Sequence, residues 1–119
     1  MQELLVVCLC AAWCDACREF GKTFERLAAR HRSAGLVWLD IEDDSDICGD
    51  IDVENFPSLA IYRGERLLHY GVSLPQEGSV ARLIDEMATR SSAAADAPRP
   101  VLELPERMAR AAAANPARR

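Results

Sequence analysis

The cysteines are the residues of this sequence whose spacing suggests chemistry. Four of the five lie between Cys8 and Cys17, in the run LVVCLCAAWCDAC. Cys14 and Cys17 form a Cys-x-x-Cys pair that follows an apolar run and opens a helical pattern. The first thiol would lie at a helix N-terminus, where backbone N–H groups and the helix dipole favour the thiolate. A thiolate attacks disulfides and a second thiol one turn further can displace the product, so the pair predicts thiol–disulfide exchange.

The apolar periodicity predicts the elements that position this pair. Leu4–Cys10 is short and apolar on both faces, as in a central strand, and a helix follows from Asp15 to about Ser33, with Gly35 as its left-handed cap. The remaining expected elements are a strand at Leu36–Glu42, a short helix at Cys48–Val53, a hairpin of Ser58–Arg63 and Arg66–Tyr70, and a helix from Pro75 to about Arg90. The order β-α-β-α-β-β-α predicts an α/β fold with a mixed central sheet flanked by helices.

The composition changes after Arg90 and divides the chain into a domain and a tail. Residues 1–90 are predicted to form one domain, whereas 91–119 are rich in Ala, Pro and Arg and contain no aromatic residue. The tail is expected to be flexible or to form a short helix near 105–114, where helix propensity is high. About ten residues make a marginal helix in water, so such a helix would need a docking surface.

Charge and hydropathy argue against several classes of protein. Lys and Arg number 14 against 19 Asp and Glu, and the net charge of −5 argues against nucleic acid as a partner, because phosphate binding needs a basic face. No apolar stretch reaches the roughly 18 to 20 residues of a membrane span, so no membrane partner is expected. No basic residue precedes the apolar run, which argues against a secretory leader. Crowded thiols fit a cytoplasmic location better than a secreted disulfide framework.

Two separated motifs carry a resemblance to a known family. They are AAWCDAC, with Trp13 directly before the first cysteine, and FPSLAIYRGE, and they stand in the predicted order of elements. From about Leu4 to Arg90 the sequence therefore resembles the thioredoxin family. The resemblance implies a thioredoxin-like fold and a cis-proline, matched here by Pro57, that faces the cysteine pair.

The resemblance also implies roles for particular residues. Cys14 would be the nucleophile and Cys17 the resolving thiol of a protein-disulfide reductase, with Trp13, Phe56 and Pro57 forming the substrate-binding surface. The implied partners are disulfide-containing proteins and, as electron donor, a reductase or a small thiol. No bound cofactor is implied.

The sequence departs from the family at positions that tune the pair. Cys8 stands where thioredoxins usually place a buried aspartate that helps to move the proton of the resolving thiol, and Trp38 stands where its lysine partner lies. We therefore expect slower exchange. Asp15 and Ala16 replace the usual Gly-Pro, and the Asp15 carboxylate opposes the thiolate that the helix N-terminus favours, so we expect a pair at least as reducing as usual.

The pattern also lacks the strand and helix with which thioredoxins usually begin. We expect this to leave apolar sheet surface that is covered either by self-association or by the tail.

Other interpretations of the cysteines stay open. Cys8 and Cys10 are two apart on a strand and point to one face, so together with Cys14 and Cys17 they could bind zinc or an iron–sulfur cluster. Core packing is the simpler interpretation of Cys8 and Cys10, because buried cysteine behaves as a small hydrophobe. Cys48 is expected to be an incidental surface cysteine. A further class is a thioredoxin-like adaptor or chaperone module, although the intact Cys-x-x-Cys pair favours chemistry.

Overall fold

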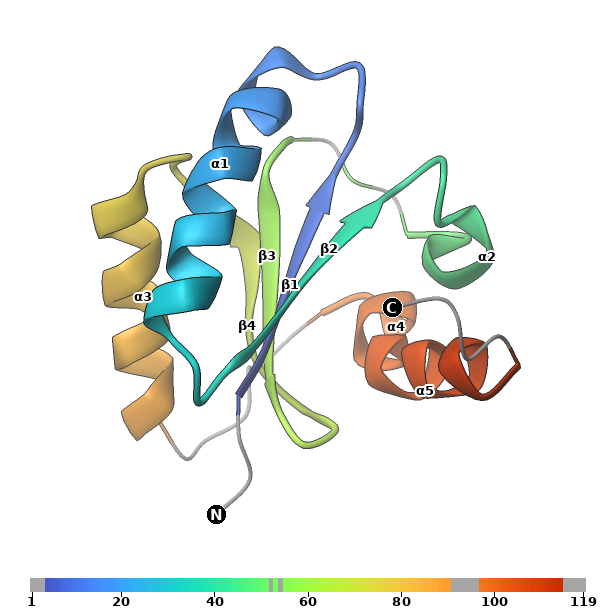
Figure 1. The fold of residues 1–119 in the computed structure, drawn as a ribbon. Helices are drawn as coiled ribbons and strands as arrows, with labels where there is room; N and C mark the ends of the chain where they lie inside the picture. The colour runs from blue at the N-terminus through green and yellow to red at the C-terminus, as the bar shows by residue number, and fades with distance from the viewer. Residues whose placement is uncertain (1–3, 52, 54, 91–96, 115–119) are drawn as a thin grey trace.

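A four-stranded sheet forms the centre of the molecule, in the order β2–β1–β3–β4 (Figure 1). The computed structural model describes residues 4–51, 53, 55–90 and 97–114 of the 119-residue chain. Strand β1 (Leu4–Cys10) runs parallel to β2 (Gly35–Asp40) and antiparallel to β3 (Ser58–Arg63), and β3 pairs antiparallel with β4 (Arg66–Val72). The mixed sheet confirms the fold class expected from the sequence.

Helices cover both faces of this sheet (Figure 1). On one face lie α1 (Asp15–Arg30) and α3 (Glu77–Thr89), and on the other lie α2 (Ser45–Cys48), α4 (Arg99–Leu102) and α5 (Leu104–Ala114). None of the helices in the described part of the chain combines the length and apolar character that a membrane span requires.

Side chains alternate along β1 and so build two separate cores. What we name the cysteine face buries Val6, Cys8, Cys10, Cys17, Phe20, Phe24, Leu27, Val80 and Ile84. What we name the tail face buries Val7, Leu9, Cys48, Tyr62, Leu67, Val101 and Leu104. Because β1 contributes apolar side chains to both cores, it needs the uninterrupted apolar sequence from which it was predicted.

Two local expectations were wrong, and both concern where helices end. The short helix forms at Ser45–Cys48 instead of Cys48–Val53, because the chain turns at Gly49, whose φ of 49° suits glycine. Gly35 does not cap α1. That helix ends at Arg30 with His31 at the C-cap, and Gly35 begins β2.

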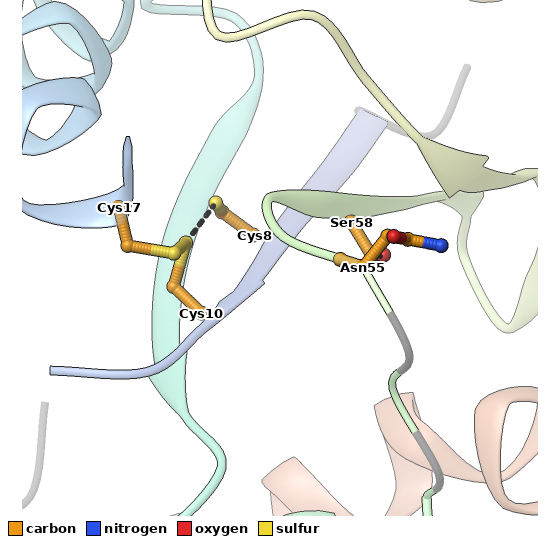
Figure 2. Close-up of a disulfide and its surroundings, with 5 residues drawn as sticks. All are labelled: Cys8, Cys10, Cys17, Asn55 and Ser58. Atoms are coloured by element: carbon orange, nitrogen blue, oxygen red, sulfur yellow. Dashed lines mark hydrogen bonds between the residues drawn. A yellow bond between two sulfur atoms is a disulfide. The ribbon is translucent and has the colours of Figure 1, made fainter. Parts of the chain in front are cut away.

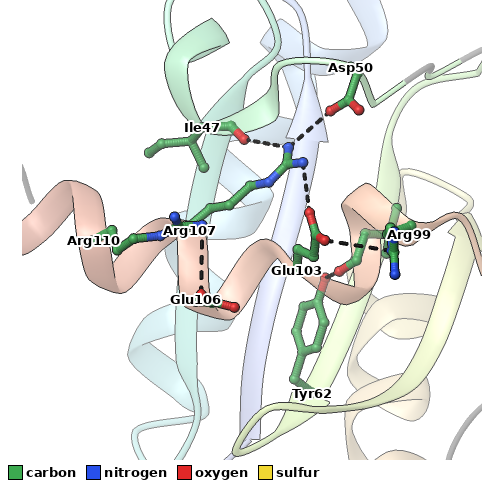
Figure 3. A network of polar contacts seen from close by, with 9 residues as sticks. Ile47, Asp50, Tyr62, Arg99, Glu103, Glu106, Arg107 and Arg110 are labelled. Atoms are coloured by element: carbon green, nitrogen blue, oxygen red, sulfur yellow. Dashed lines mark hydrogen bonds and ion pairs between the residues drawn. The ribbon is translucent and has the colours of Figure 1, made fainter.

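The tail contributes a docked helical pair in the region where a short helix was expected. Val101 and Leu104 are fully buried on the tail face, and the Tyr62 hydroxyl donates a hydrogen bond to the Val101 carbonyl over 2.7 Å (Figure 3). The Arg107 guanidinium donates to the Ile47 carbonyl at 3.2 Å and to carboxylate oxygens of Asp50 at 3.1 Å and Glu103 at 2.9 Å (Figure 3). Residues 99–114 are therefore part of the folded unit.

Cys48 lies beneath this helical pair and is 1% exposed, so the prediction of a surface cysteine was wrong. Burial, supported by the nearby charge of Asp44, raises the pKa of the Cys48 thiol to about 11. The thiol therefore stays protonated near neutral pH and packs as a small apolar group.

Candidate thiol–disulfide site

The Cys-x-x-Cys pair lies at the start of α1, which follows β1 after a short loop. Cys14 is the N-cap of α1, with extended backbone angles. Its N–H bonds to the Ala11 carbonyl at 3.0 Å, and its own carbonyl accepts the Arg18 N–H at 3.1 Å. The Cys14 thiol is free and partly exposed. The structure therefore places this thiol at a helix N-terminus, as the spacing predicted.

Cys17 forms a disulfide with Cys10, whereas the resemblance implied a pairing with Cys14 (Figure 2). The Cα atoms of Cys10 and Cys17 are 5.8 Å apart, and the two residues are 0% and 1% exposed. The pairing arises because the first turn of α1 packs over the end of β1, so both side chains enter the core of the cysteine face. Cys10 is therefore more than the packing residue that the sequence suggested. The catalytic roles of Cys14 and Cys17 stay a prediction.

Cys8 lies beside this disulfide on the same face of β1, as the strand spacing predicted. Its Sγ atom is 3.7 Å from that of Cys10 (Figure 2). Burial raises the pKa of the Cys8 thiol far above its ordinary value, so the thiol stays neutral. Cys8 therefore does not provide a carboxylate-like proton acceptor near the pair.

Trp38 occupies the other position of the charged pair that thioredoxins usually carry. It is in register with Cys8 on the neighbouring strand, and its ring packs 5.6 Å from that of Phe24, measured between ring centroids. Both positions are thus apolar, and the site has no buried charge there that would need a partner.

Metal binding by the four cysteines finds no support in this geometry. Among the residues that the structure describes, no group of three or more Cys, His, Asp or Glu side chains is arranged to hold a metal ion.

Two of the expected substrate-binding residues are in contact, Phe56 and the Trp13 that directly precedes Cys14. The ring centroids of Trp13 and Phe56 are 5.4 Å apart, with the rings nearly perpendicular, and the indole is 62% exposed. The Phe56–Pro57 peptide bond is cis, which confirms the cis-proline that the resemblance implied. Ser58 begins β3 and donates its hydroxyl to the Asn55 carbonyl at 2.7 Å, which closes the turn before the strand (Figure 2).

Two acidic residues that the sequence analysis did not assign to the site support this region. The indole N–H of Trp13 donates a hydrogen bond to Glu42. The Asp40 carboxylate, 8% exposed, accepts N–H bonds from Glu42 at 2.8 Å and Asp43 at 3.0 Å, and another from Ala12. Burial acts to raise the pKa of Asp40, but these backbone donors outweigh it and the pKa is lowered. The sequence signal was the position of Asp40 near the end of the strand predicted at Leu36–Glu42, directly before the acidic loop.

Arg18 is a further residue that sequence reasoning missed. Its guanidinium forms an ion pair with Asp15, on the exposed side of the first turn of α1. The Asp15 carboxylate thus has a cationic partner that the sequence analysis did not consider. The i,i+3 spacing of the two residues was the signal for this pair.

Solved structures share this fold. The germline-specific thioredoxin Deadhead of Drosophila melanogaster matches with a TM-score of 0.63 and 22% identity, over 71% of this chain and 81% of that one. The thioredoxin of Fasciola hepatica matches with a TM-score of 0.65 and 19% identity, over 72% and 82%. At these identities the likeness shows that the fold is shared.

The family follows from sequence comparison. The thioredoxin family model matches residues 1–86, and the chain belongs to the thioredoxin family. Thioredoxin-2 of Saccharomyces cerevisiae is 31% identical over 62 residues, which are 52% of this chain and 60% of the yeast protein. A Thioredoxin H-type protein of Brassica campestris is 27% identical over 82 residues, which are 69% of this chain and 67% of that protein. Family membership and a cysteine pair at disulfide distance support thiol–disulfide chemistry.

Proposed function

We propose that this protein is a thiol–disulfide oxidoreductase that reduces or exchanges disulfides in other proteins. The observation that carries the proposal is the placement of a free, partly exposed Cys14 thiol at the N-terminus of α1, with buried Cys17 one turn further. This position leaves the sulfur on the side that a substrate can reach, at the end of α1 where the backbone N–H groups of the first turn have no partner within the helix.

In the proposed reaction the Cys14 thiolate attacks a substrate disulfide, forms a mixed disulfide and releases one substrate thiolate. The Cys17 thiolate then attacks the Cys14 sulfur, which releases the second substrate thiolate and leaves a Cys14–Cys17 disulfide. Two thiol protons pass to the two substrate sulfurs. Cys17 must be a thiol when this cycle begins, so the bond to Cys10 has to be open in the working form.

The proposed docking surface consists of Trp13, Phe56 and Pro57. The exposed indole offers apolar contact, and Phe56 supports it edge to face. A surface of this kind suits an extended segment around a disulfide in a protein substrate. We propose that a reductase or a small thiol supplies the electrons and that the protein acts in the cytoplasm.

Reduction of insulin disulfides with dithiothreitol as electron donor tests the proposal. The protein is purified anaerobically and its metal content is measured beforehand. We expect metal-free wild type to accelerate the reaction and Cys14→Ser to lose the acceleration. Cys48→Ala is the matched control, because Cys48 is buried on the opposite face of the sheet, and it should keep the activity. A folded, inactive wild type would overturn the proposal and favour an adaptor module.

A further inference from the structure

The proposed cycle uses two cysteines, Cys14 and Cys17, but on the cysteine face Cys17 is bonded to a third, Cys10. Cys17 is bonded to Cys10 on β1, while Cys14, which shares the first turn of α1 with Cys17, is a free thiol. Cys17 is thus common to two pairings, the disulfide with Cys10 in the structure and the disulfide with Cys14 in the proposed cycle. One pairing is buried between strand and helix, and the other would lie at the partly exposed end of the helix.

We propose that Cys10 is a third redox cysteine, which takes the disulfide over from Cys14 by exchange at Cys17. The inference rests on the proposed function, because a substrate disulfide supplies the oxidising equivalents. After substrate turnover has left Cys14–Cys17, the Cys10 sulfur attacks the Cys17 sulfur. The Cys10–Cys17 bond forms, the Cys14–Cys17 bond breaks, the Cys10 thiol gives up its proton and Cys14 gains one. The step is an isomerisation with no net change in oxidation state.

Because Cys10 and Cys17 are buried, the proposed exchange moves the disulfide to a place that external thiols do not reach. Cys10 and Cys17 are 0% and 1% exposed, so an external thiol does not reach either sulfur of their disulfide directly. Cys14 packs against the same core and is the partly exposed member of the set. Electrons therefore enter and leave the buried disulfide through Cys14, and the oxidised protein keeps a free Cys14 thiol.

Cys8 is the alternative third cysteine, and the structure argues against it. Its sulfur lies 3.7 Å from that of Cys10, but it is fully buried and not bonded. Cys8 and Cys10 are equally buried, and what separates them is that the sulfur of Cys10, and not that of Cys8, is bonded to Cys17. Cys8 is thus a packing neighbour of the exchanging sulfurs and serves as the matched control.

Disulfide mapping during a single oxidation tests the exchange. Reduced protein is mixed with excess insulin, quenched with acid at increasing times, blocked with N-ethylmaleimide and digested with endoproteinase Asp-N. Cleavage before Asp15 separates Cys17, in 15–39, from the other three cysteines of the motif, in 1–14. Fragmentation of the 1–14 peptide then shows which of Cys8, Cys10 and Cys14 carries the blocking group.

In wild type we expect Cys14–Cys17 to appear first and to convert into Cys10–Cys17 with blocked Cys14. In Cys10→Ala, and in the closer-sized Cys10→Val, oxidation should stop at Cys14–Cys17. In Cys14→Ser, Cys10–Cys17 should form at least about tenfold more slowly, because the accessible thiol is gone. Cys8→Ala should behave as wild type.

Three results would overturn the inference. They are a wild type that keeps only Cys14–Cys17, a Cys14→Ser variant that forms Cys10–Cys17 at the wild-type rate, and a Cys8→Ala variant that loses the Cys10–Cys17 bond. The first can occur with insulin reduction intact, so the proposed function would survive it. If wild type fails to reduce insulin, the proposed function fails, and the same mapping after oxidation by oxidised glutathione still decides whether Cys17 exchanges partners.

Discussion

The two faces of the sheet are both well buried, but they are built by different means. On the cysteine face the long helices α1 and α3 supply regular apolar stripes, and α1 carries both Cys17 and the core residue Phe20. On the tail face the cover consists of the shorter helices α2, α4 and α5, anchored by Val101 and Leu104 and tied by polar contacts (Figures 1 and 3).

The proposed redox chemistry therefore belongs to the cysteine face, and the tail face contributes to stability. The elements that pack the cysteine face also position the reactive sulfurs, so a substitution there is expected to alter both stability and exchange. The tail face contains Cys48 as a protonated packing residue and none of the proposed catalytic residues. Changes on that face should therefore act on stability first.

The largest expected effect is that of truncation after Arg90, which removes the cover of the tail face. Burial of a Val or Leu side chain stabilises by about 1.5–3 kcal/mol, so losing Val101 and Leu104 costs about 3–6 kcal/mol. That is a large part of the roughly 5–15 kcal/mol by which small domains are stable. We expect loss of cooperative thermal unfolding by circular dichroism, or self-association by light scattering.

Leu102→Ala in the full chain is the control, because Leu102 is about half exposed. It should leave the melting temperature nearly unchanged. A truncated protein that is monomeric and as stable as the full chain would show that the docked tail does not support the fold.

A matched pair of core substitutions compares the two faces directly. Phe20→Ala on the cysteine face should lower the free energy of unfolding by about 3–5 kcal/mol, and Leu104→Ala on the tail face by about 2–5 kcal/mol. At a temperature where both variants are folded, Phe20→Ala should also slow insulin reduction, because Phe20 lies on the helix that positions Cys17. Loss of activity in folded Leu104→Ala would contradict the separation of the faces.

Asp40→Asn tests the loop contacts at the end of β2, beside the site. Hydrogen bonds to a charged group are worth about 1.5–3 kcal/mol. The Asp40 carboxylate accepts backbone N–H groups from Glu42 and Asp43 in the loop after β2 and from Ala12 in the loop after β1. The lowered folded-state pKa means that this stabilisation is present above the ordinary carboxyl pKa of about 4 and is lost as the pH falls through the folded-state value.

Urea unfolding should therefore show Asp40→Asn to be less stable than wild type at pH 7, with a smaller difference at pH 3. Asp43→Asn, which changes an exposed neighbour, should match wild type at both pH values. A difference between Asp40→Asn and wild type that does not change with pH would refute the role of the ionised carboxylate.

Tyr62→Phe tests one polar contact of the tail face while keeping the ring. Losing the hydroxyl leaves the buried Val101 carbonyl without this donor, and we expect a loss of about 1 kcal/mol in the free energy of unfolding. The substitution should accelerate amide hydrogen exchange more in α5 than in α1. Equal acceleration in both helices would show that the contact does not hold the tail in particular.

The smallest expected effect is that of Arg18→Ala, which removes the exposed partner of Asp15. Exposed ion pairs contribute little, so stability should change by less than about 0.5 kcal/mol. The unbalanced Asp15 charge should lower the rate of Cys14 alkylation by less than about threefold. Arg26→Ala, whose partner is Glu77, is the control and should leave that rate unchanged. Faster alkylation in Arg18→Ala would reverse this electrostatic interpretation.

Much of the fold could be predicted because its signals are local. The apolar run of β1, the helical spacing that begins at Asp15 and the Gly64-Glu65 hairpin each lie within a few residues, and the sheet has the expected mixed order. One error arose where a single backbone angle decided the outcome, and another where a glycine began a strand instead of ending a helix. The turn at Gly49 ended α2 before the predicted position, and nothing nearby in the sequence shows that Gly35 would enter a strand.

The sequence by itself determined that a thiol would lie at a helix N-terminus directly after an aromatic residue, because the Cys-x-x-Cys spacing and the position of Trp13 are properties of the chain. Only the tertiary structure decided which sulfur Cys17 bonds, since that depends on how α1 packs across the end of β1. It also decided that Cys48 is buried, because the covering helices come from the distant tail. Spacing describes neighbours along the chain, whereas burial and disulfide pairing depend on elements that meet only after folding.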